Sequence, residues 1–190
     1  IGAGEGIYSQ LFKKRGHNVV ATDINKKSMS ELKDSGVSTK SGDFLKIKFK
    51  GKFDVIIMSH IIEHLYNPSR VVKKLRDLLN KNGIIYIKTP NSDFMFLNFI
   101  KSNTYLFDAP RHINIFSKKS LNILFEGEEF SNIDIRDQFV LNEFVNFYKI
   151  KLNNKIGKTK LGLIAIFFLP LAIISYILGK SSRMIAIIRR

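Results

Sequence analysis

IGAGEG (residues 1–6) is a glycine-rich turn, and the expected architecture of the chain follows from it. Glycine stands at every second position, at Gly2, Gly4 and Gly6, and the apolar residues that come next begin a helix. Glycine lets the backbone turn tightly and bring its amides close to a ligand, and the free amides of a helix N-terminus attract the same ligand. The turn therefore indicates a nucleotide-type site, although such a hexapeptide taken alone is more often an ordinary loop.

A turn of this kind normally follows a buried β-strand, but Ile1 stands directly at the turn. We therefore expect the sequence to be N-terminally truncated and to lack the strand at the centre of the sheet. The two strands beside that position would then have no shared partner. On this expectation the isolated chain is poorly stable or aggregates.

The composition narrows the classes of protein and of site. The length of 190 residues suits one α/β domain with a modest appendage rather than two full domains. There is no cysteine, so disulfides and thiolate metal sites are excluded. His60 and His64 flank Glu63, but their order is not the HExxH of zinc proteases. We expect no metal site.

Two helices and two strands are expected after the turn. Residues 8–15 and 26–34 have helical patterns, while 17–22 and 36–40 read as strands. Asp23 follows the first of these strands, about twenty residues beyond the turn, where a carboxylate can accept hydrogen bonds from a ribose diol. The alternative role for Asp23 is the N-cap of the second helix, and both roles remain open.

Asp43 and Phe44, in the segment SGDF, stand at the end of the weaker strand. A carboxylate there can accept a hydrogen bond from an adenine amine while the phenyl ring packs on the base. A plain turn is an equally good interpretation of the segment.

The middle of the chain predicts a strand, a helix and another strand. FDVIIM (53–58) is a continuous apolar run, typical of a strand buried on both faces. A helix is expected from Pro68 to the Asn82–Gly83 stop, followed by a strand at 84–88. Strand, helix and strand in this order predict a doubly wound α/β fold with ligands beyond the carboxyl ends of a parallel sheet.

These segments together resemble a known family. The motifs are IGAGEG, Asp23, SGDF (41–44), FDVIIMSHIIEHL (53–65), the helix 67–83, IIYIKTPN (84–91) and RHINIFSKKSLNILFEGEEF (111–130). In this order and spacing they look like class I S-adenosylmethionine-dependent methyltransferases, in the small-molecule branch that includes the ubiquinone-biosynthesis O-methyltransferases. The resemblance covers roughly residues 1–138. It implies a Rossmann-like, mostly parallel sheet with an antiparallel last strand and helices on both faces.

The resemblance also implies which residues hold S-adenosylmethionine. The glycine turn would line its methionine and ribose part, Asp23 would hold the ribose, Asp43 and Phe44 the adenine, and the backbone after the 53–58 strand would close the site. The cofactor-binding residues expected in this way are Gly2, Ala3, Gly4, Gly6, Asp23, Ile24, Asp43, Phe44, Ser59 and His60.

A neutral histidine near a hydroxyl acceptor can remove its proton, and His60, His64 and His112 are the candidates for this base. Of these, His64 and His112 are the expected catalytic residues. His64 matches the second residue of the family's Glu-His pair, for which a structural role beside the sheet is the favoured interpretation. His112, in a loop before the expected helix at 117–125, is expected to face the acceptor. Nearby aromatic side chains either line that pocket or form core; they are Phe94, Phe96, Phe99, Tyr105, Phe107 and Phe116.

The last part of the chain is basic and apolar. Residues 144–190 contain nine lysines or arginines and no acid, and residues 161–179 carry no charge at all. We expect 1–138 to be the methyltransferase core, 139–182 a membrane-associating insertion, and 183–190 the last strand of the core. The uncharged run is expected to form a helical hairpin broken at Pro170 or an interfacial element; a bilayer span and a buried helix are the alternatives.

The expected function is methyl transfer from S-adenosylmethionine to a small-molecule or lipid-linked acceptor, at a hydroxyl and at the cytoplasmic face of a membrane. The alternative is a non-catalytic, methyltransferase-like module that interacts with partners at a membrane. A nucleic-acid substrate is not expected, because the basic residues of the tail adjoin an apolar run.

Overall fold

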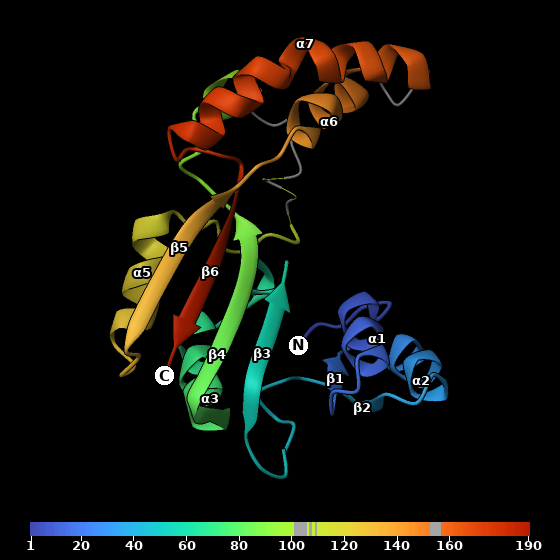
Figure 1. The fold of residues 1–190 in the computed structure, drawn as a ribbon, viewed down its shortest axis with the longest axis vertical. Coiled ribbons are helices and arrows are strands. Elements are labelled where there is room, and N and C mark those ends of the chain that lie inside the picture. Colours follow the sequence, from blue (N-terminus) through green and yellow to red (C-terminus); the bar gives the residue numbers. More distant parts are fainter. Residues whose placement is uncertain (101–105, 107, 109, 153–156) are drawn as a thin grey trace.

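Figure 1 shows the arrangement of the chain in the computed structural model, which describes residues 1–100, 106, 108, 110–152 and 157–190. β1 (Val20–Asp23) pairs in parallel with β2 (Ser38–Ser41). The other four strands form a sheet in the order β3–β4–β6–β5. Their bounds are Phe53–Ser59 for β3, Leu79–Pro90 for β4, Asn132–Gln138 for β5 and Arg183–Arg189 for β6.

The direction of these strands confirms the expected α/β fold. β3 and β4 run parallel, as do β1 and β2, whereas β6 lies antiparallel between β4 and β5. The helices are α1 (Ile7–Lys14), α2 (Lys26–Asp34), α3 (Pro68–Leu78), α4 (Leu97–Ile100), α5 (Lys118–Glu126), α6 (Asn142–Lys151) and α7 (Lys158–Ile177), together with the 3₁₀ turn η1 (Ile62–His64).

The main hydrophobic core lies between α3, α5 and one face of the four-stranded sheet (Figure 1). Alternate residues of the strands point to this face, as the pleat requires. The fully buried members from strands and helices include Met58, Ile85, Ile87, Met184, Ile188, Leu75, Leu121 and Phe125. Burial of this apolar stripe holds the carboxyl ends of β3 and β4 in a constant position.

α3 ends earlier than its sequence pattern predicts. The helix stops at Leu78, and Leu79 already has extended backbone and pairs with Phe53 in the sheet. The prediction that the helix runs to Gly83 is wrong. Leu79 is completely buried in the main core, and this tertiary contact outweighs the local helical pattern.

The start of α3 offers a test of its capping. The side chain of Asn67 accepts a hydrogen bond from the Arg70 amide at 3.1 Å, and Pro68 occupies the first turn. We expect Asn67→Ala to lower the free energy of unfolding by about 1 kcal/mol, measured by urea denaturation. Asn82→Ala, at an exposed position of β4, is the matched control and should change it by less than about 0.5 kcal/mol. An equal loss in both variants would contradict the capping role.

β3 is not buried on both faces, contrary to expectation. Val55 is 46% exposed, although it lies in the middle of the apolar run. Among the described residues, β3 and β1 belong to separate sheets and do not pair with each other. The side of β3 that faces β1 is therefore open along part of its length.

The first residues of the chain bridge β1 and β3. The Ile1 nitrogen donates to the Ile57 carbonyl at 2.8 Å, and the Ala3 amide donates to the Thr22 carbonyl at 2.9 Å. A cavity of about 60 Å³ lies beside this bridge, and residues of both strands, including Val55, line it. A central strand missing from the sequence remains a prediction.

α6 and α7 form a second hydrophobic cluster beyond the carboxyl end of β4 (Figure 1). The rings of Phe144 and Phe168 stack with their centroids 4.9 Å apart, and Phe94 is buried against Phe144. α7 is one helix that continues through Pro170, so the expected hairpin is wrong. Proline removes one backbone donor from a helix but does not end it when tertiary packing holds both halves.

The aromatic residues expected near the acceptor fall into different surroundings. Phe94 and Phe96 belong to the α6–α7 cluster, while Phe116 is buried in the main core. The core interpretation therefore fits these three. Phe99 is exposed, and Tyr105 and Phe107 lie outside the described residues.

Candidate functional site

The glycine turn has the conformation that its sequence predicts. Gly2, Gly4 and Gly6 have φ angles of 61°, 52° and 78°, in the left-handed region that favours glycine. Gly6 is also the N-cap of α1, where no side chain caps the helix. A Cβ on Gly2 would clash with Ile61, and one on Gly6 would clash with Leu32. The turn is thus a cradle that packs closely against Ile61 and Leu32.

Asp23 fastens this turn to the end of β1. Its carboxylate accepts hydrogen bonds from the Gly4 amide at 2.8 Å and from the Asn25 amide at 2.9 Å. The N-cap of α2 is Asn25, whose side chain accepts from the amides of Lys27 and Ser28, so the cap role for Asp23 is wrong. The carboxylate lies beside the glycine turn, where it can also accept hydrogen bonds from a ribose. The neighbouring Ile24 is almost fully exposed.

Asp43 lies close to the end of β1 because the amide of Gly42 donates to the Asp23 carbonyl at 2.9 Å. The Asp43 side chain accepts a hydrogen bond from the Leu45 amide at 2.9 Å. Asp43 therefore does form the plain turn, and its exposed carboxylate lies at the same edge of β1 and β2 as Asp23. Its contact with an adenine remains a prediction.

Phe44 is a core residue whose ring is largely buried. The Lys74 ammonium lies 5.0 Å from the ring centroid and donates to three carbonyls, those of Phe44, Leu45 and Ile47. Burial lowers the pKa of Lys74. Lys74, which lies on α3, thus fixes the loop that contains Phe44. The position of Lys74 in a helical pattern did not predict this contact. Stacking of Phe44 on adenine remains a prediction.

Ser59 and His60 lie where β3 ends. His60 has a φ angle of 56°, unusual for a residue with a side chain, and its amide donates to the Lys88 carbonyl of β4 at 2.8 Å. Its Nδ1 lies 3.2 Å from Oε1 of Glu63, which is only 1% exposed. The other carboxylate oxygen accepts from the Thr89 hydroxyl at 3.0 Å. Glu63 therefore ties η1 to the sheet.

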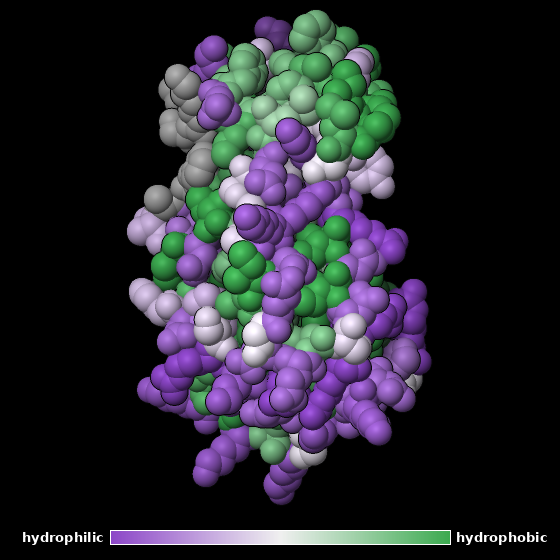
Figure 2. Space-filling view, turned by 90° about the vertical axis from the view of Figure 1, so that its left-hand side faces the viewer, coloured by the Kyte–Doolittle hydropathy of each residue, from purple (hydrophilic) through white to green (hydrophobic). Residues whose placement is uncertain are grey.

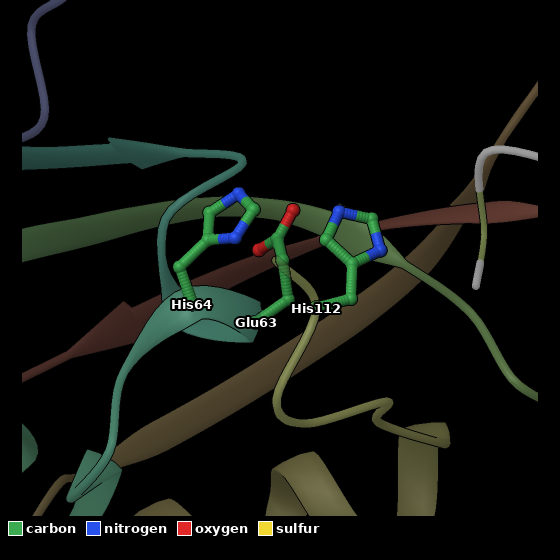
Figure 3. Close-up of side chains that lie close together, drawn as sticks. All are labelled: Glu63, His64 and His112. Carbon is green, nitrogen blue, oxygen red and sulfur yellow. The ribbon is translucent and has the colours of Figure 1, made fainter. Parts of the chain in front are cut away.

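His64 and His112 lie next to each other although they are far apart in the sequence. Their ring centroids are 4.9 Å apart, and Figure 3 shows the Glu63 carboxylate between the two rings. His64 Nδ1 lies 2.7 Å from the Arg111 carbonyl, and His112 Nδ1 lies 2.7 Å from the Leu106 carbonyl. In each ring the nitrogen next to a carbonyl must carry the proton, so Nε2 is the acceptor when the ring is neutral.

A cavity of about 130 Å³ opens beside these histidines. His60 and His112 line it, whereas His64 does not. The other lining residues are Pro90, Leu106, Asp108, Glu143, Ser182 and Arg183. His112 therefore lines a cavity. That this cavity takes the acceptor, and that His112 is catalytic, both stay predictions.

Glu143 and Arg183 were not expected at the site. Arg183 Nη2 lies 3.0 Å from Oε1 of Glu143, which is almost fully buried. The pair joins α6 to the first residue of β6. The one available signal was that Glu143 is the last acid of the chain, before a long run that contains only basic charges.

Glu63, His64 and His112 also offer donor atoms within 4.8 Å of one another, close enough to consider a metal ion. However, both carboxylate oxygens of Glu63 already accept hydrogen bonds from protein groups. Both rings are likewise fixed by backbone carbonyls. We therefore interpret the group as a hydrogen-bonded cluster, and the absence of a metal remains a prediction.

Comparison with known proteins agrees with this geometry. A family model described as a methyltransferase domain matches residues 1–135. A ubiquinone biosynthesis O-methyltransferase of Pelagibacter ubique is 35% identical over 97 residues, which is 48% of this chain and 40% of that protein. The corresponding protein of Pseudomonas aeruginosa is 26% identical over 99 residues, again 48% of this chain and 43% of the relative. The match spans less than half the length of these relatives.

Solved structures share the fold over the whole chain. A methyltransferase from Thermotoga maritima superposes with a TM-score of 0.66 at 14% identity, covering 100% of this chain and 79% of that one. One from Archaeoglobus fulgidus gives a TM-score of 0.63 at 20% identity, covering 100% and 83%. With the glycine turn, the acid at the end of β1 and an antiparallel last strand in the same chain, this protein belongs to the methyltransferase-domain family of class I S-adenosylmethionine-dependent methyltransferases.

Proposed function

We propose that the protein transfers a methyl group from S-adenosylmethionine to a hydroxyl of a small-molecule or lipid-linked acceptor. The observation that carries this proposal is the hydrogen bond between the Gly4 amide and the Asp23 carboxylate, which joins the two elements of a nucleoside site. The glycine turn, Asp23 and Asp43 would hold the cofactor. When bound, it supplies a methyl group already activated by a positive sulfur, so few catalytic groups are needed.

The cofactor cradle and the cavity share one segment of the chain. Gly2 packs against Ile61, and the adjacent His60 lines the cavity. An acceptor in the cavity therefore approaches the cradle across this segment. The side chains that line the cavity would hold the acceptor in line with the carbon–sulfur bond of the cofactor and exclude water. His112 is positioned to hold the acceptor hydroxyl from the opposite loop. The relatives are named as O-methyltransferases of ubiquinone biosynthesis. We therefore propose a hydroxylated aromatic ring with an apolar tail as the acceptor.

α7 is the feature that favours an acceptor at a membrane. It is the one helix in the described part of the chain that is long and apolar enough to cross a bilayer. Its exposed side chains lie at helical spacing, with Ile166, Phe167 and Ile177 each at least 70% exposed. Figure 2 shows hydrophobic surface at this end of the molecule, above a largely hydrophilic remainder.

The neighbours of α7 favour a position in the membrane surface over a span. α6 packs against one side of α7, and β6 returns to the sheet directly after it. If α7 crossed a bilayer, either β6 or α6 would have to lie on the far side. A helix in the plane of the interface keeps both in place. The surrounding lysines and the lack of acids after Glu143 match an anionic, cytoplasmic leaflet.

A methyl-transfer screen of the full-length protein tests the proposal. With radiolabelled S-adenosylmethionine, we expect label in a prenylated catechol or phenol and none in nucleic acid. A heat-inactivated sample is the control, and calorimetry measures cofactor binding separately. Binding without transfer to any phenol, quinone precursor or lipid-linked saccharide would contradict the proposed acceptors. Failure to bind S-adenosylmethionine would support the non-catalytic alternative.

A further inference from the structure

We propose that His60, oriented by the buried Glu63, is the base that takes the hydroxyl proton of the acceptor. The proposal rests on the proposed function, since it assigns a role within that reaction. His60 would touch the acceptor and so be catalytic, while Glu63 would act through it as a positioning residue.

The backbone of His60 has an unfavourable conformation. A left-handed φ of 56° costs a residue with a Cβ about 1 kcal/mol or more, and such residues cluster where a function requires them. Here the bond from the His60 amide to the Lys88 carbonyl at the end of β4 holds the conformation. The consequence is that the imidazole turns back over η1 toward Glu63 and the cavity.

The hydrogen bonds of Glu63 determine which nitrogen of His60 carries the proton. Both of its oxygens are engaged, one by the Thr89 hydroxyl and the other by His60 Nδ1. An ionised carboxylate only accepts, so Nδ1 of His60 must carry the proton and Nε2 must hold the lone pair. A carboxylate that fixes the tautomer and stabilises the imidazolium is the arrangement found in catalytic triads.

His60 is better suited to this role than the other two histidines. All three have Nδ1 beside an oxygen, but the partners of His64 and His112 are neutral carbonyls. Only His60 has a carboxylate partner among these rings, and its side chain is partly exposed, at 36%. It also lies directly before Ile61, against which the glycine turn packs. His60 therefore stands between the expected cofactor and the cavity.

The charges around the cavity leave Glu63 as the direct partner of His60. The titratable or charged groups that line the cavity with His60 are Asp108, His112, Glu143 and Arg183. Asp108 binds Arg111, and Glu143 binds Arg183. β4 contacts His60 through the backbone carbonyl of Lys88, which accepts from the His60 amide.

The step balances without a further reactant. The acceptor oxygen forms a bond to the methyl carbon, and the carbon–sulfur bond breaks with its electron pair remaining on sulfur. The hydroxyl proton moves to Nε2 of His60, and solvent then removes it. The cofactor leaves as neutral S-adenosylhomocysteine.

Steady-state kinetics of the full-length protein with a prenylated catechol test the role. We expect His60→Gln to lower kcat about 10²-fold, with acceptor KM changed less than about threefold, and to abolish the fall in kcat toward low pH that an imidazole base produces. Glu63→Gln should lower kcat about tenfold and keep that fall. His17→Gln, at an exposed position after α1, is the matched control and should change neither. An unchanged kcat in His60→Gln would overturn the proposal.

A second measurement does not depend on the acceptor. In ¹⁵N-histidine NMR spectra of the protein, we expect the neutral ring of His60 to carry its proton on Nδ1, and this preference to be lost in Glu63→Gln. A proton on Nε2 in the wild type would overturn the proposal even if the enzyme is active. If the NMR result holds but no acceptor in the screen is methylated, the acceptor assignment fails rather than the pair. Unchanged far-UV circular dichroism spectra of His60→Gln and Glu63→Gln show that the fold is intact.

Discussion

Replacing Asp23 with alanine is expected to weaken the binding of S-adenosylmethionine about 10²- to 10³-fold, as measured by isothermal titration calorimetry. The carboxylate would accept both ribose hydroxyls, and charge-assisted hydrogen bonds contribute about 1.5–3 kcal/mol each. Its loss also frees the Gly4 amide, to which it is bonded at 2.8 Å, so the cradle loses its anchor to β1. Both effects act in the same direction.

Asp34→Ala is the matched control for this experiment. Asp34 is an exposed acid at the end of α2, away from the glycine turn, so its removal changes the net charge equally. We expect its dissociation constant to stay within about twofold of the wild type. Equal weakening in both variants would point to a general charge effect. Unchanged binding in Asp23→Ala would place the ribose elsewhere.

Introducing aspartate at two exposed positions of α7, Phe167→Asp with Ile177→Asp, is expected to abolish membrane binding. These side chains are 75% and 74% exposed. Each buried apolar side chain contributes about 1.5–3 kcal/mol, so the partition coefficient onto vesicles should fall about 10³-fold. Sedimentation with vesicles of phosphatidylcholine and phosphatidylglycerol measures this coefficient.

Ile123→Asp provides the matched control, because Ile123 is an exposed isoleucine on α5 and not on α7. Its binding to vesicles should remain that of the wild type. If the double variant binds as well as the control, α7 is not the membrane contact. If the wild type binds no vesicles and instead forms stable oligomers that the double variant loses, the apolar face is a contact between copies.

Several elements could be predicted because their signals are local. The bounds of α2 follow from its helical pattern and agree with the structure. The N-cap of α5 is Ser117, as its position before the helical pattern predicts. The antiparallel β6 was expected from the family resemblance, and it pairs with β4 and β5.

Two of the wrong predictions, the end of α3 and the break at Pro170, have one cause in common, which is that tertiary packing overrode a local signal. α3 gives up its last residues because Leu79 is buried in the sheet. Pro170 does not break α7, because Phe168 and Ala172 on either side of it pack against the same cluster. Val55 is exposed because the side of β3 that faces β1 is open along part of its length. An apolar run in the sequence gives no indication of such an open side.

At the site, local patterns were enough to place the glycine turn and the acid after β1, since both depend on a short segment and its spacing. The histidine–glutamate pair depends on the fold. Glu63 is held by Thr89 from the next strand, and His112 reaches the same cavity from a loop beyond β4. No spacing encodes these contacts, because they form only when parallel pairing brings the carboxyl ends of β3 and β4 to one edge of the sheet.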